Sequence, residues 1–357
     1  MLALQAVTPE RLVRELPSVT ISEARKLVAM VHRGEPVHAT SSVRRCAAQA
    51  ALAVGHVPEL SVVAEVASRI DPFVKYLCAG DRGDRFETVR IPLEREGRYT
   101  ACVSSQVGCA LACAFCATGR LGLSRNLAAW EIIEQVRIVR SRLPLSTAGR
   151  PPINRVHGVV FQGMGEPLAN LDAVLEAIAV MSEPSALGID ARAITVCTAG
   201  LPSGIRRLAA EQPRVRLGLS MSSAIAAHRK RVMPIADRHE LDDVIDACAF
   251  HAKTTGLSPM WAVTLLDGVN DSDADARALA ARVIAFTEAT GRRPRISIVA
   301  YNAISDDDPA SAPEPFQRSN REPAFRAVLS AAGLPSHRRY SGGGDVAAAC
   351  GQLANTL

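Results

Sequence analysis

The sequence predicts an α/β protein: an open, partial barrel of six β/α units that follows a small helical domain. Two observations lead to this fold class. From about residue 99, β-rich apolar runs alternate with helical stretches long enough for right-handed crossovers between parallel strands. The first 70 residues show helical patterns instead. Six units are too few to close an eight-fold barrel, so we expect an open one.

Residues 1–70 are expected to form short helices of an accessory domain. Thr8 and Pro9 supply a cap and a first-turn proline for the first helix, and Gly34 and Gly55 end the next two. The second helix is expected to begin at the serine of SEARKLVAMVHRG. Paired basic residues, as in SSVRRC, fit a nucleic-acid accessory, and a plain packing module is an equal alternative.

Residues 71–98 read as a β-rich connector, with strands at PFVKYLCA and RFETVRIPL. The barrel is expected over residues 99–341. Its strands are predicted at TACVSSQ, RVHGVVFQ, AITVCTA, VRLGLSMS, PMWAVTLL and RISIVAYN. Residues 342–357 form a tail in which three consecutive glycines precede Cys350, and we expect these glycines to act as a hinge.

Composition limits the class of protein. The net charge of +5, from 41 Lys+Arg against 36 Asp+Glu, is compatible with an RNA partner without demanding one. There is no apolar run near eighteen residues and no basic start to the N-terminus, so neither a membrane span nor a secretory signal is expected. Nine cysteines, an odd and unevenly spaced set, favour a reducing cytoplasm over a secreted disulfide scaffold.

The strongest chemical signal is the cysteine motif Cys109-x₃-Cys113-x₂-Cys116. Three thiolates can hold three irons of a 4Fe–4S cluster and leave the fourth iron open to a small molecule. The alternative is structural zinc with Cys102 as a fourth thiolate, but the six-residue gap after Cys102 fits zinc-ribbon spacing badly. The spacing therefore favours the open cluster.

Polar residues follow several predicted strands. Gly163 and Gly165 permit close backbone approach before Glu166, whose carboxylate is suited to hold an ammonium group. The alternative for this segment is an ordinary turn with a solvated carboxylate. Active sites of parallel β/α barrels form at the carboxyl ends of strands. The other candidates at this edge are Cys197, Thr198, Ser220, Met221, Ser222 and Asn302.

The string CVSSQVGCALACAFCATGRLGLSRNL resembles the RlmN/Cfr family of radical S-adenosylmethionine (SAM) RNA adenine methyltransferases, and the resemblance runs from FETVRIP to AACGQL, about three quarters of the chain. It implies a radical SAM type of partial barrel. It also implies one 4Fe–4S cluster and two SAM molecules per turnover. The residues it assigns are Cys109, Cys113 and Cys116 to the cluster, and Gly165, Glu166, Cys197, Ser220, Met221, Ser222 and Asn302 to SAM.

Three positions depart from the family pattern. Cys197 stands where the family has a serine, which keeps a small side chain but weakens a hydrogen bond. Ser222 replaces a histidine and removes a ring from the SAM contacts. Gly342 replaces an arginine found in many relatives, which is expected to alter how the tail is held.

The resemblance also implies a mechanism. Cys350 takes a methyl group from one SAM, and a radical made from a second SAM activates that group for addition to the base. Glu87, in FETVRIP, is then the candidate proton acceptor, although a lone carboxylate in a strand is more often a solvated edge residue. Cys102 attacks the sulfur of Cys350, which releases the product and leaves a transient disulfide. The favoured product is adenine methylated at C2, with C8 as the alternative.

The implied partners are large-subunit ribosomal RNA, transfer RNA or both, together with an electron donor such as a flavodoxin. We expect a cytoplasmic monomer that binds no membrane. Arg120 and Arg125, behind the cysteine loop, are the first candidates for phosphate contacts. Two alternatives remain at this point: a radical SAM enzyme with a diverged substrate, and a non-catalytic, zinc-stabilised RNA-binding protein.

Overall fold

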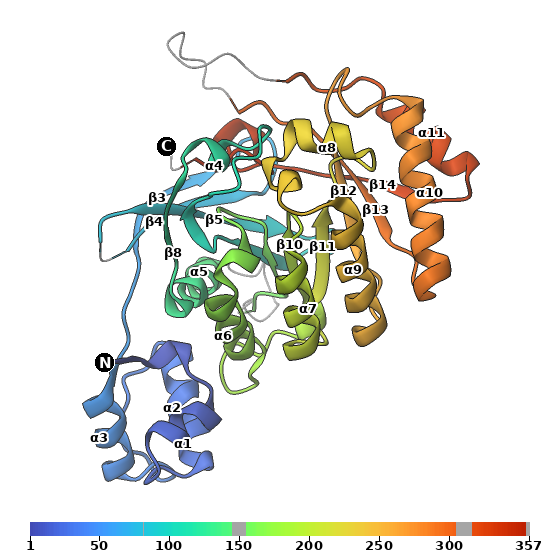
Figure 1. The fold of residues 1–357 in the computed structure, drawn as a ribbon. Coiled ribbons are helices and arrows are strands. Elements are labelled where there is room, and N and C mark those ends of the chain that lie inside the picture. The colour runs from blue at the N-terminus through green and yellow to red at the C-terminus, as the bar shows by residue number, and fades with distance from the viewer. Residues whose placement is uncertain (81, 145–154, 305–315, 355–357) are drawn as a thin grey trace.

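The computed structural model describes residues 1–80, 82–144, 155–304 and 316–354. Its centre is a ten-stranded sheet in the order β14-β13-β12-β11-β10-β9-β6-β5-β4-β3 (Figure 1). Seven neighbouring strands are parallel: β6 (Tyr99–Val103), β9 (Gly158–Phe161), β10 (Ile194–Thr198), β11 (Arg216–Ser220), β12 (Met260–Leu265), β13 (Arg295–Ala300) and β14 (Ser336–Arg339). The antiparallel part is β3 (Ser61–Ala67), β4 (Val74–Ala79) and β5 (Arg85–Pro92), and β5 pairs with β6.

The sheet is an open partial barrel, since among the described residues its edge strands β3 and β14 do not pair with each other. The six strands that the sequence predicts for the barrel are all present, and so are both predicted strands of the connector. The sequence reading missed the seventh parallel strand, β14, whose residues SHRR lack the apolar pattern of a buried strand. This omission matters because β14 carries Arg339 towards the site described below.

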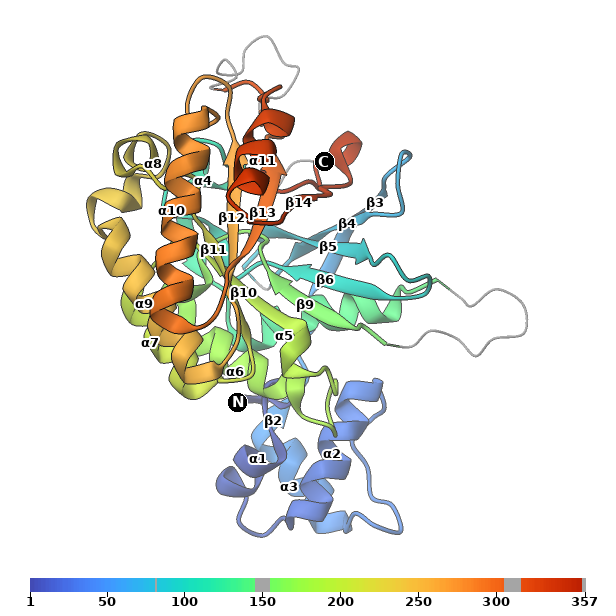
Figure 2. The ribbon, with the colours of Figure 1, turned by 90° about the vertical axis from the view of Figure 1, so that its right-hand side faces the viewer.

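Helices cover one face of the parallel strands (Figure 2). They are α5 (Ala129–Ser141), α6 (Leu171–Ser182), α7 (Pro202–Glu211), α9 (Leu241–Thr255), α10 (Asp273–Thr290) and α11 (Glu322–Ala331). Shorter helices are α4 (Ala117–Arg120) and α8 (Ala226–Val232), and a small second sheet joins β7 (Gln106–Gly108) to β8 (Leu123–Asn126). Nowhere in the described part of the chain is a helix both long and apolar enough to cross a membrane.

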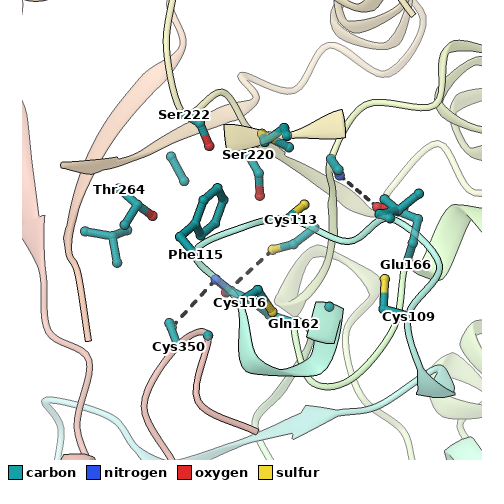
Figure 3. A pocket seen from close by; sticks show the side chains of 18 of the residues that line it. Cys109, Cys113, Phe115, Cys116, Gln162, Glu166, Ser220, Ser222, Thr264 and Cys350 are labelled. Carbon is teal, nitrogen blue, oxygen red and sulfur yellow. Dashed lines mark hydrogen bonds between the residues drawn. The ribbon is translucent and has the colours of Figure 1, made fainter. Parts of the chain in front are cut away.

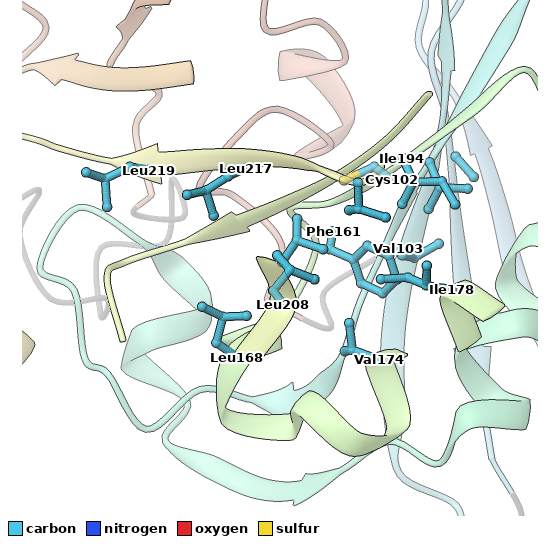
Figure 4. Close-up of a cluster of buried hydrophobic side chains, with 14 of the residues drawn as sticks. Cys102, Val103, Phe161, Leu168, Val174, Ile178, Ile194, Leu208, Leu217 and Leu219 are labelled. Atoms are coloured by element: carbon cyan, nitrogen blue, oxygen red, sulfur yellow. The ribbon is translucent and has the colours of Figure 1, made fainter. Parts of the chain in front are cut away.

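The core between the sheet and these helices is apolar and closely packed (Figure 4). Val103 of β6 and Phe161 of β9 lie against Val174 and Ile178 of α6, and all four side chains are almost completely buried. Burial of such a side chain contributes about 1.5–3 kcal/mol to folding. The strands are thus fixed where their carboxyl ends begin the loops of the site.

The N-terminal helices α1 (Pro9–Glu15), α2 (Ile21–Arg33) and α3 (Arg45–Val54) form a separate core below the main body, with a small sheet of β1 (Leu2–Ala3) and β2 (Gly55–His56) (Figure 1). The predicted cap of α1 and the predicted ends of α2 and α3 are confirmed.

Two details of this region differ from the sequence reading. The second helix begins one residue before the expected serine, because Thr20 caps it and forms a capping box with Glu23. Strand β3 lies inside the segment expected to be helical and forms the edge of the main sheet. The division into domains at residues 70, 98 and 341 stays a prediction.

Replacing Thr20 with alanine should destabilise α2 by about 1 kcal/mol, because the backbone N–H of Glu23 loses its hydroxyl acceptor. Hydrogen exchange at the α2 amides measures this change. Thr20→Ser keeps the hydroxyl and serves as the control. Equal exchange in the alanine and serine variants would contradict the role of the cap.

Candidate active site

A cavity at the carboxyl edge of the parallel strands brings most of the predicted site residues together (Figure 3). Those that line it are Cys109, Cys113, Cys116, Gly165, Glu166, Cys197, Ser220, Ser222, Asn302 and Cys350. Met221 is the exception among the expected SAM contacts, because its side chain is fully buried in the apolar core. Cys102 and Glu87 also lie outside this first cavity.

The three cysteines of the motif lie on the loop between β7 and α4. The loop is held by backbone contacts: Ala114 N–H donates to the Val232 carbonyl at 3.0 Å, and Cys116 N–H donates to the Cys113 carbonyl at 3.1 Å. Burial raises the pKa of Cys109 to about 11 and also raises the pKa values of Cys113 and Cys116. Thiolates in such a setting need positive charge beside them, and bound iron would supply it.

The donor set fits an iron–sulfur cluster better than a single ion. In the described part of the chain, no three His, Cys, Asp or Glu side chains are grouped to hold one metal ion. A cluster differs in this respect, because each thiolate binds a different iron. Cys102, the fourth ligand in the zinc alternative, lines a second cavity that the other three thiols do not line.

Glu166 is 4% exposed and sits between two backbone segments. Its carboxylate oxygens accept hydrogen bonds from Leu168 N–H at 3.0 Å and from Ala199 N–H at 2.8 Å. Burial nevertheless raises the pKa of this carboxyl group. Gly165 before it has a φ of 95°, and a Cβ there would come within 2.5 Å of Gln106 Cβ. A glycine is required at this position.

Arg229 is a functional residue that sequence reading missed, since it belongs to a basic triplet that reads as a solvated helix face. In the structure it is 1% exposed. Its guanidinium donates to the carbonyls of Ser220 (2.9 Å), Met221 (2.8 Å) and Ala199 (2.5 Å). Arg229 therefore holds together the ends of β10 and β11, where the cavity begins.

Arg125, expected to contact phosphate, does not have a free guanidinium. It forms ion pairs with Asp84 and with Glu131, the latter at 2.7 Å, and its side chain is 17% exposed. Those two carboxylates already neutralise its charge, so its role is structural. Arg120 is exposed and remains a candidate for RNA contact.

The C-terminal tail crosses the mouth of the cavity. Asn302 Nδ2 donates to the Cys350 carbonyl at 3.0 Å and to Ser341 Oγ at 3.1 Å, while Cys350 N–H donates to Ser341 Oγ at 2.8 Å. The next carbonyl, of Gly351, accepts from Ala117 N–H at 2.7 Å, at the start of α4. Asn302 thus holds the backbone of Cys350 as well as lining the cavity.

Cys350 faces two cavities, and Cys102 lines the second one with it. Gln162 also lines both cavities. Its Nε2 donates to Cys350 Sγ at 3.7 Å (Figure 3), and its Oε1 accepts a hydrogen bond from Cys197 Sγ at 3.7 Å. All nine cysteines carry free thiols. Burial raises the pKa of Cys102 to about 12. The structure thus brings two cysteines 248 positions apart in sequence to one cavity.

Glu87 is buried on β5, two residues from Val89, which pairs with Cys102. Its carboxylate forms an ion pair with Lys75 at 2.9 Å and accepts a hydrogen bond from Ala354 N–H at 2.9 Å. The alternative of a solvated edge residue is therefore wrong. The carboxylate faces the tail, although it lines neither of the two cavities.

Gly342 fits its surroundings because it has no side chain. A Cβ there would lie well inside contact distance of the Phe73 ring and 2.6 Å from Asp71 Oδ2. Asp71 instead accepts hydrogen bonds from Gly343 N–H and Tyr340 Oη, both at 2.8 Å. These contacts clamp the tail to the turn between β3 and β4 and give a physical reason for the absent arginine.

Comparisons of sequence and of structure both match this chain, over most of its length, to methyltransferases. A probable RNA methyltransferase of Sorangium cellulosum is 56% identical, over 94% of this chain and 88% of that protein. A probable dual-specificity RNA methyltransferase RlmN of Moorella thermoacetica is 35% identical, over 98% and 96%. The crystal structure of a radical SAM methyltransferase from Sphaerobacter thermophilus matches with a TM-score of 0.84 and 33% identity over the full length of both chains. No protein-family model matches the chain.

Replacing Gly342 with alanine should detach the tail, because the new Cβ collides with Phe73 and Asp71. Cleavage of the tail by a protease at low concentration, followed by mass spectrometry, should become several-fold faster. Gly344→Ala is the matched control, since a Cβ at that position meets no atom within 4 Å. Equal cleavage of the two variants would contradict the proposed clamp.

Proposed function

The chain belongs to the RlmN/Cfr family of radical SAM RNA methyltransferases, and we propose that it methylates C2 of an adenine in ribosomal and transfer RNA through a methylated Cys350. That it is an RNA methyltransferase removes the alternative of a non-catalytic zinc-stabilised protein. The observation that carries the finer proposal is the position of Cys350. This residue lines both the cavity of the three-cysteine loop and the cavity of Cys102.

The first cavity has the groups that the cofactors require. The 4Fe–4S cluster would be held by Cys109, Cys113 and Cys116. The Glu166 carboxylate would accept hydrogen bonds from the ammonium group of SAM, because the two backbone N–H groups leave some of its lone pairs unused. The cluster and SAM together supply, when bound, a radical able to remove hydrogen from a methyl group. Ser220, Ser222, Asn302 and Cys197 offer small polar contacts around the same space.

Ser222, which replaces the family's histidine, is compatible with this assignment. It has a left-handed backbone with φ of 55°, is 2% exposed, and lines the cavity with its small side chain. Its carbonyl accepts from Asn270 Nδ2 at 2.6 Å, which fixes this strained position. We propose that the backbone at Ser222 keeps its place in the SAM site while the histidine contact is absent.

Cys350 would act as the methyl acceptor. As a thiolate it attacks the methyl carbon of SAM: an S–C bond forms, the bond to the sulfonium sulfur breaks, and Cys350 becomes a neutral thioether. Gln162 Nε2 and the fixed backbone of Cys350 hold the sulfur at the border of the two cavities. The methyl group can therefore be loaded in one cavity and lie within reach of a base in the other.

Cys102 would be the resolving thiol and Glu87 the proton acceptor. A Cys102–Cys350 disulfide requires Cα atoms about 4.4–6.8 Å apart, and lining one cavity is consistent with that reach. Glu87 is bound to Ala354 N–H of the tail, so displacement of the tail by the substrate would free one carboxylate oxygen. This coupling favours proton removal late in the reaction.

We favour C2 over C8 because the commoner branch of the family modifies that carbon. A flavodoxin-like protein is the proposed electron donor, and the cytoplasm is the proposed compartment because free thiols and a reduced cluster need reducing conditions. The alternative of a radical SAM enzyme with a diverged substrate is disfavoured by the RNA methyltransferases that match most of the chain.

A strain that lacks the gene should contain one ribosomal or transfer RNA adenosine lighter by a single methyl group than in the parent. Mass mapping of RNase digests measures this difference, and fragmentation distinguishes C2 from C8. Restoring the gene with Cys350→Ala should not return the methyl group, whereas a gene with Cys46→Ala, at an exposed position, should. Unchanged RNA in the deletion strain would refute the proposed substrate.

Cys102→Ala should retain its iron and accumulate protein–RNA adducts linked through Cys350, because release needs the second thiol. Cys113→Ala should lose cluster iron, measured by iron content and visible absorbance after anaerobic purification. Adducts are measured by gel shift under denaturing conditions. Loss of iron in Cys102→Ala would instead make Cys102 a ligand and end its assignment as the resolving thiol.

A further inference from the structure

Arg339, at the end of β14, has an environment that its sequence does not reveal. It lines the second cavity with Cys102 and Cys350. Its guanidinium lies close enough to Cys197 to interact with it electrostatically, while its Nη1 is buried without a hydrogen-bond partner. Its neighbour Arg338 has a different setting, being exposed and in an ion pair with Glu322 at 3.4 Å. Two adjacent arginines therefore have two different roles.

The charged and titratable groups around Arg339 are mainly thiols. Cys102 comes from β6, Cys197 from β10 and Cys350 from the tail, and each interacts electrostatically with the guanidinium. Among the described residues, no carboxylate lies within ion-pair distance of Arg339; Glu87, on the same sheet, is paired with Lys75. Arg339 is half-buried, and a guanidinium whose Nη1 is closed off from water without a counter-charge is in an unfavourable position. A thiolate is the available counter-charge.

We propose that Arg339 is a positioning residue that stabilises negative charge on two sulfur atoms in turn, first on Cys350 when it accepts the methyl group and then on Cys102 when it releases the product. This inference rests on the proposed function and adds a residue to it. One cation is sufficient because the two thiolates are needed at different times. The methylated sulfur of Cys350 is uncharged and no longer competes for the guanidinium.

The release step makes this requirement explicit. The Cys102 thiolate attacks the sulfur of Cys350, an S–S bond forms, and the S–C bond to the base breaks. The electron pair of that bond moves to the methylene carbon, which takes a proton from water and becomes the methyl group. The two sulfurs together give up two electrons to the carbon and become a disulfide, so the methylene carbon is the oxidant in this step. No further oxidant is needed, but Cys102 must be a thiolate.

Electrostatics in the cavity agree with this order of events. Burial raises the pKa of Cys102 to about 12, and a negative charge on Cys350 raises it as well, whereas Arg339 lowers it. Cys197 on β10 adds a smaller raising effect. When Cys350 is methylated, its raising effect on the pKa of Cys102 disappears and the lowering effect of Arg339 remains. The fraction of Cys102 thiolate should therefore increase at the stage that needs it.

The test is the rate at which iodoacetamide alkylates Cys102 between pH 7 and 9. Anaerobic, cluster-loaded protein is used without SAM or RNA, and the Cys102 peptide is quantified by mass spectrometry. Arg339→Gln should slow alkylation about tenfold at each pH, equivalent to about one pKa unit. Arg339→Lys should keep the rate within about threefold, and Arg338→Gln should not change it.

Whether Arg339→Gln slows or speeds the alkylation of Cys102 distinguishes an electrostatic role of Arg339 from a purely structural one. A variant that only loosened the site would expose Cys102 and speed its alkylation, so an unchanged or faster rate in Arg339→Gln would overturn the proposal. An equal loss in Arg339→Lys would also do so, because lysine keeps the charge. If Arg339→Gln does not fold, the Arg339→Lys rate and its slope against pH still decide between these outcomes.

The sequential part has its own test. Cys350→Ala removes the competing charge, so Cys102 should react faster, and Arg339→Gln should slow Cys102 by a larger factor in this background than in the wild type. If Arg339→Gln slows Cys102 alkylation by the same factor in the wild type and in Cys350→Ala, the proposal that Arg339 stabilises first one thiolate and then the other is refuted. Since the assay needs neither RNA nor methyl transfer, its failure leaves the RNA mass mapping untouched, and failure of that mapping leaves the thiol measurements valid.

Discussion

The proposed chemistry of this molecule depends on the docking of a short C-terminal tail across the mouth of the partial barrel. Asn302 and Ser341 hold the backbone of Cys350, and Gly351 accepts a hydrogen bond from the first residue of α4. The cysteine loop is thereby joined to the last segment of the chain. Without these few hydrogen bonds, each worth about 0.5–1.5 kcal/mol, the sulfur of Cys350 would not border both cavities.

A rigid frame and a weakly held tail serve different needs. Arg229 is fixed by three carbonyls and Glu166 by two backbone N–H groups, and all of these hydrogen bonds except the one to Ser220 are fully buried, so the ends of β10 and β11 have little freedom. The tail is held mainly by groups near the surface, such as Asp345 with Ser68 Oγ at 2.7 Å and Arg69 N–H at 2.8 Å. Contacts of that kind open at lower cost than the core.

Local pattern determined what could be predicted from the sequence. The six parallel strands follow from apolar runs and were accessible to prediction. The assignment of Cys109, Cys113 and Cys116 as cluster ligands follows from their spacing and stays a proposal. Strand β14 was not accessible to prediction, because it lies at the edge of the sheet and its residues SHRR lack the apolar pattern of a buried strand. Gln162, Arg229 and Arg339 were also missed, since each acquires its role from partners brought together by the fold. Arg125 was misassigned for the same reason: its partner Asp84 lies 41 positions away.

The position of Cys350 between two cavities also resolves a chemical conflict. A sulfur that accepts a methyl group must meet the donor, and a sulfur that is released by a second thiol must meet that thiol from a direction opposite to the leaving carbon. One shared cavity would place the donor, the base and Cys102 in competition for the same space. Separate cavities let Gln162 and the tail backbone hold a single sulfur at their border, with Arg339 on the side of Cys102. In the proposed mechanism, this division of the space around one atom would allow the same cysteine to be loaded in one cavity and unloaded in the other.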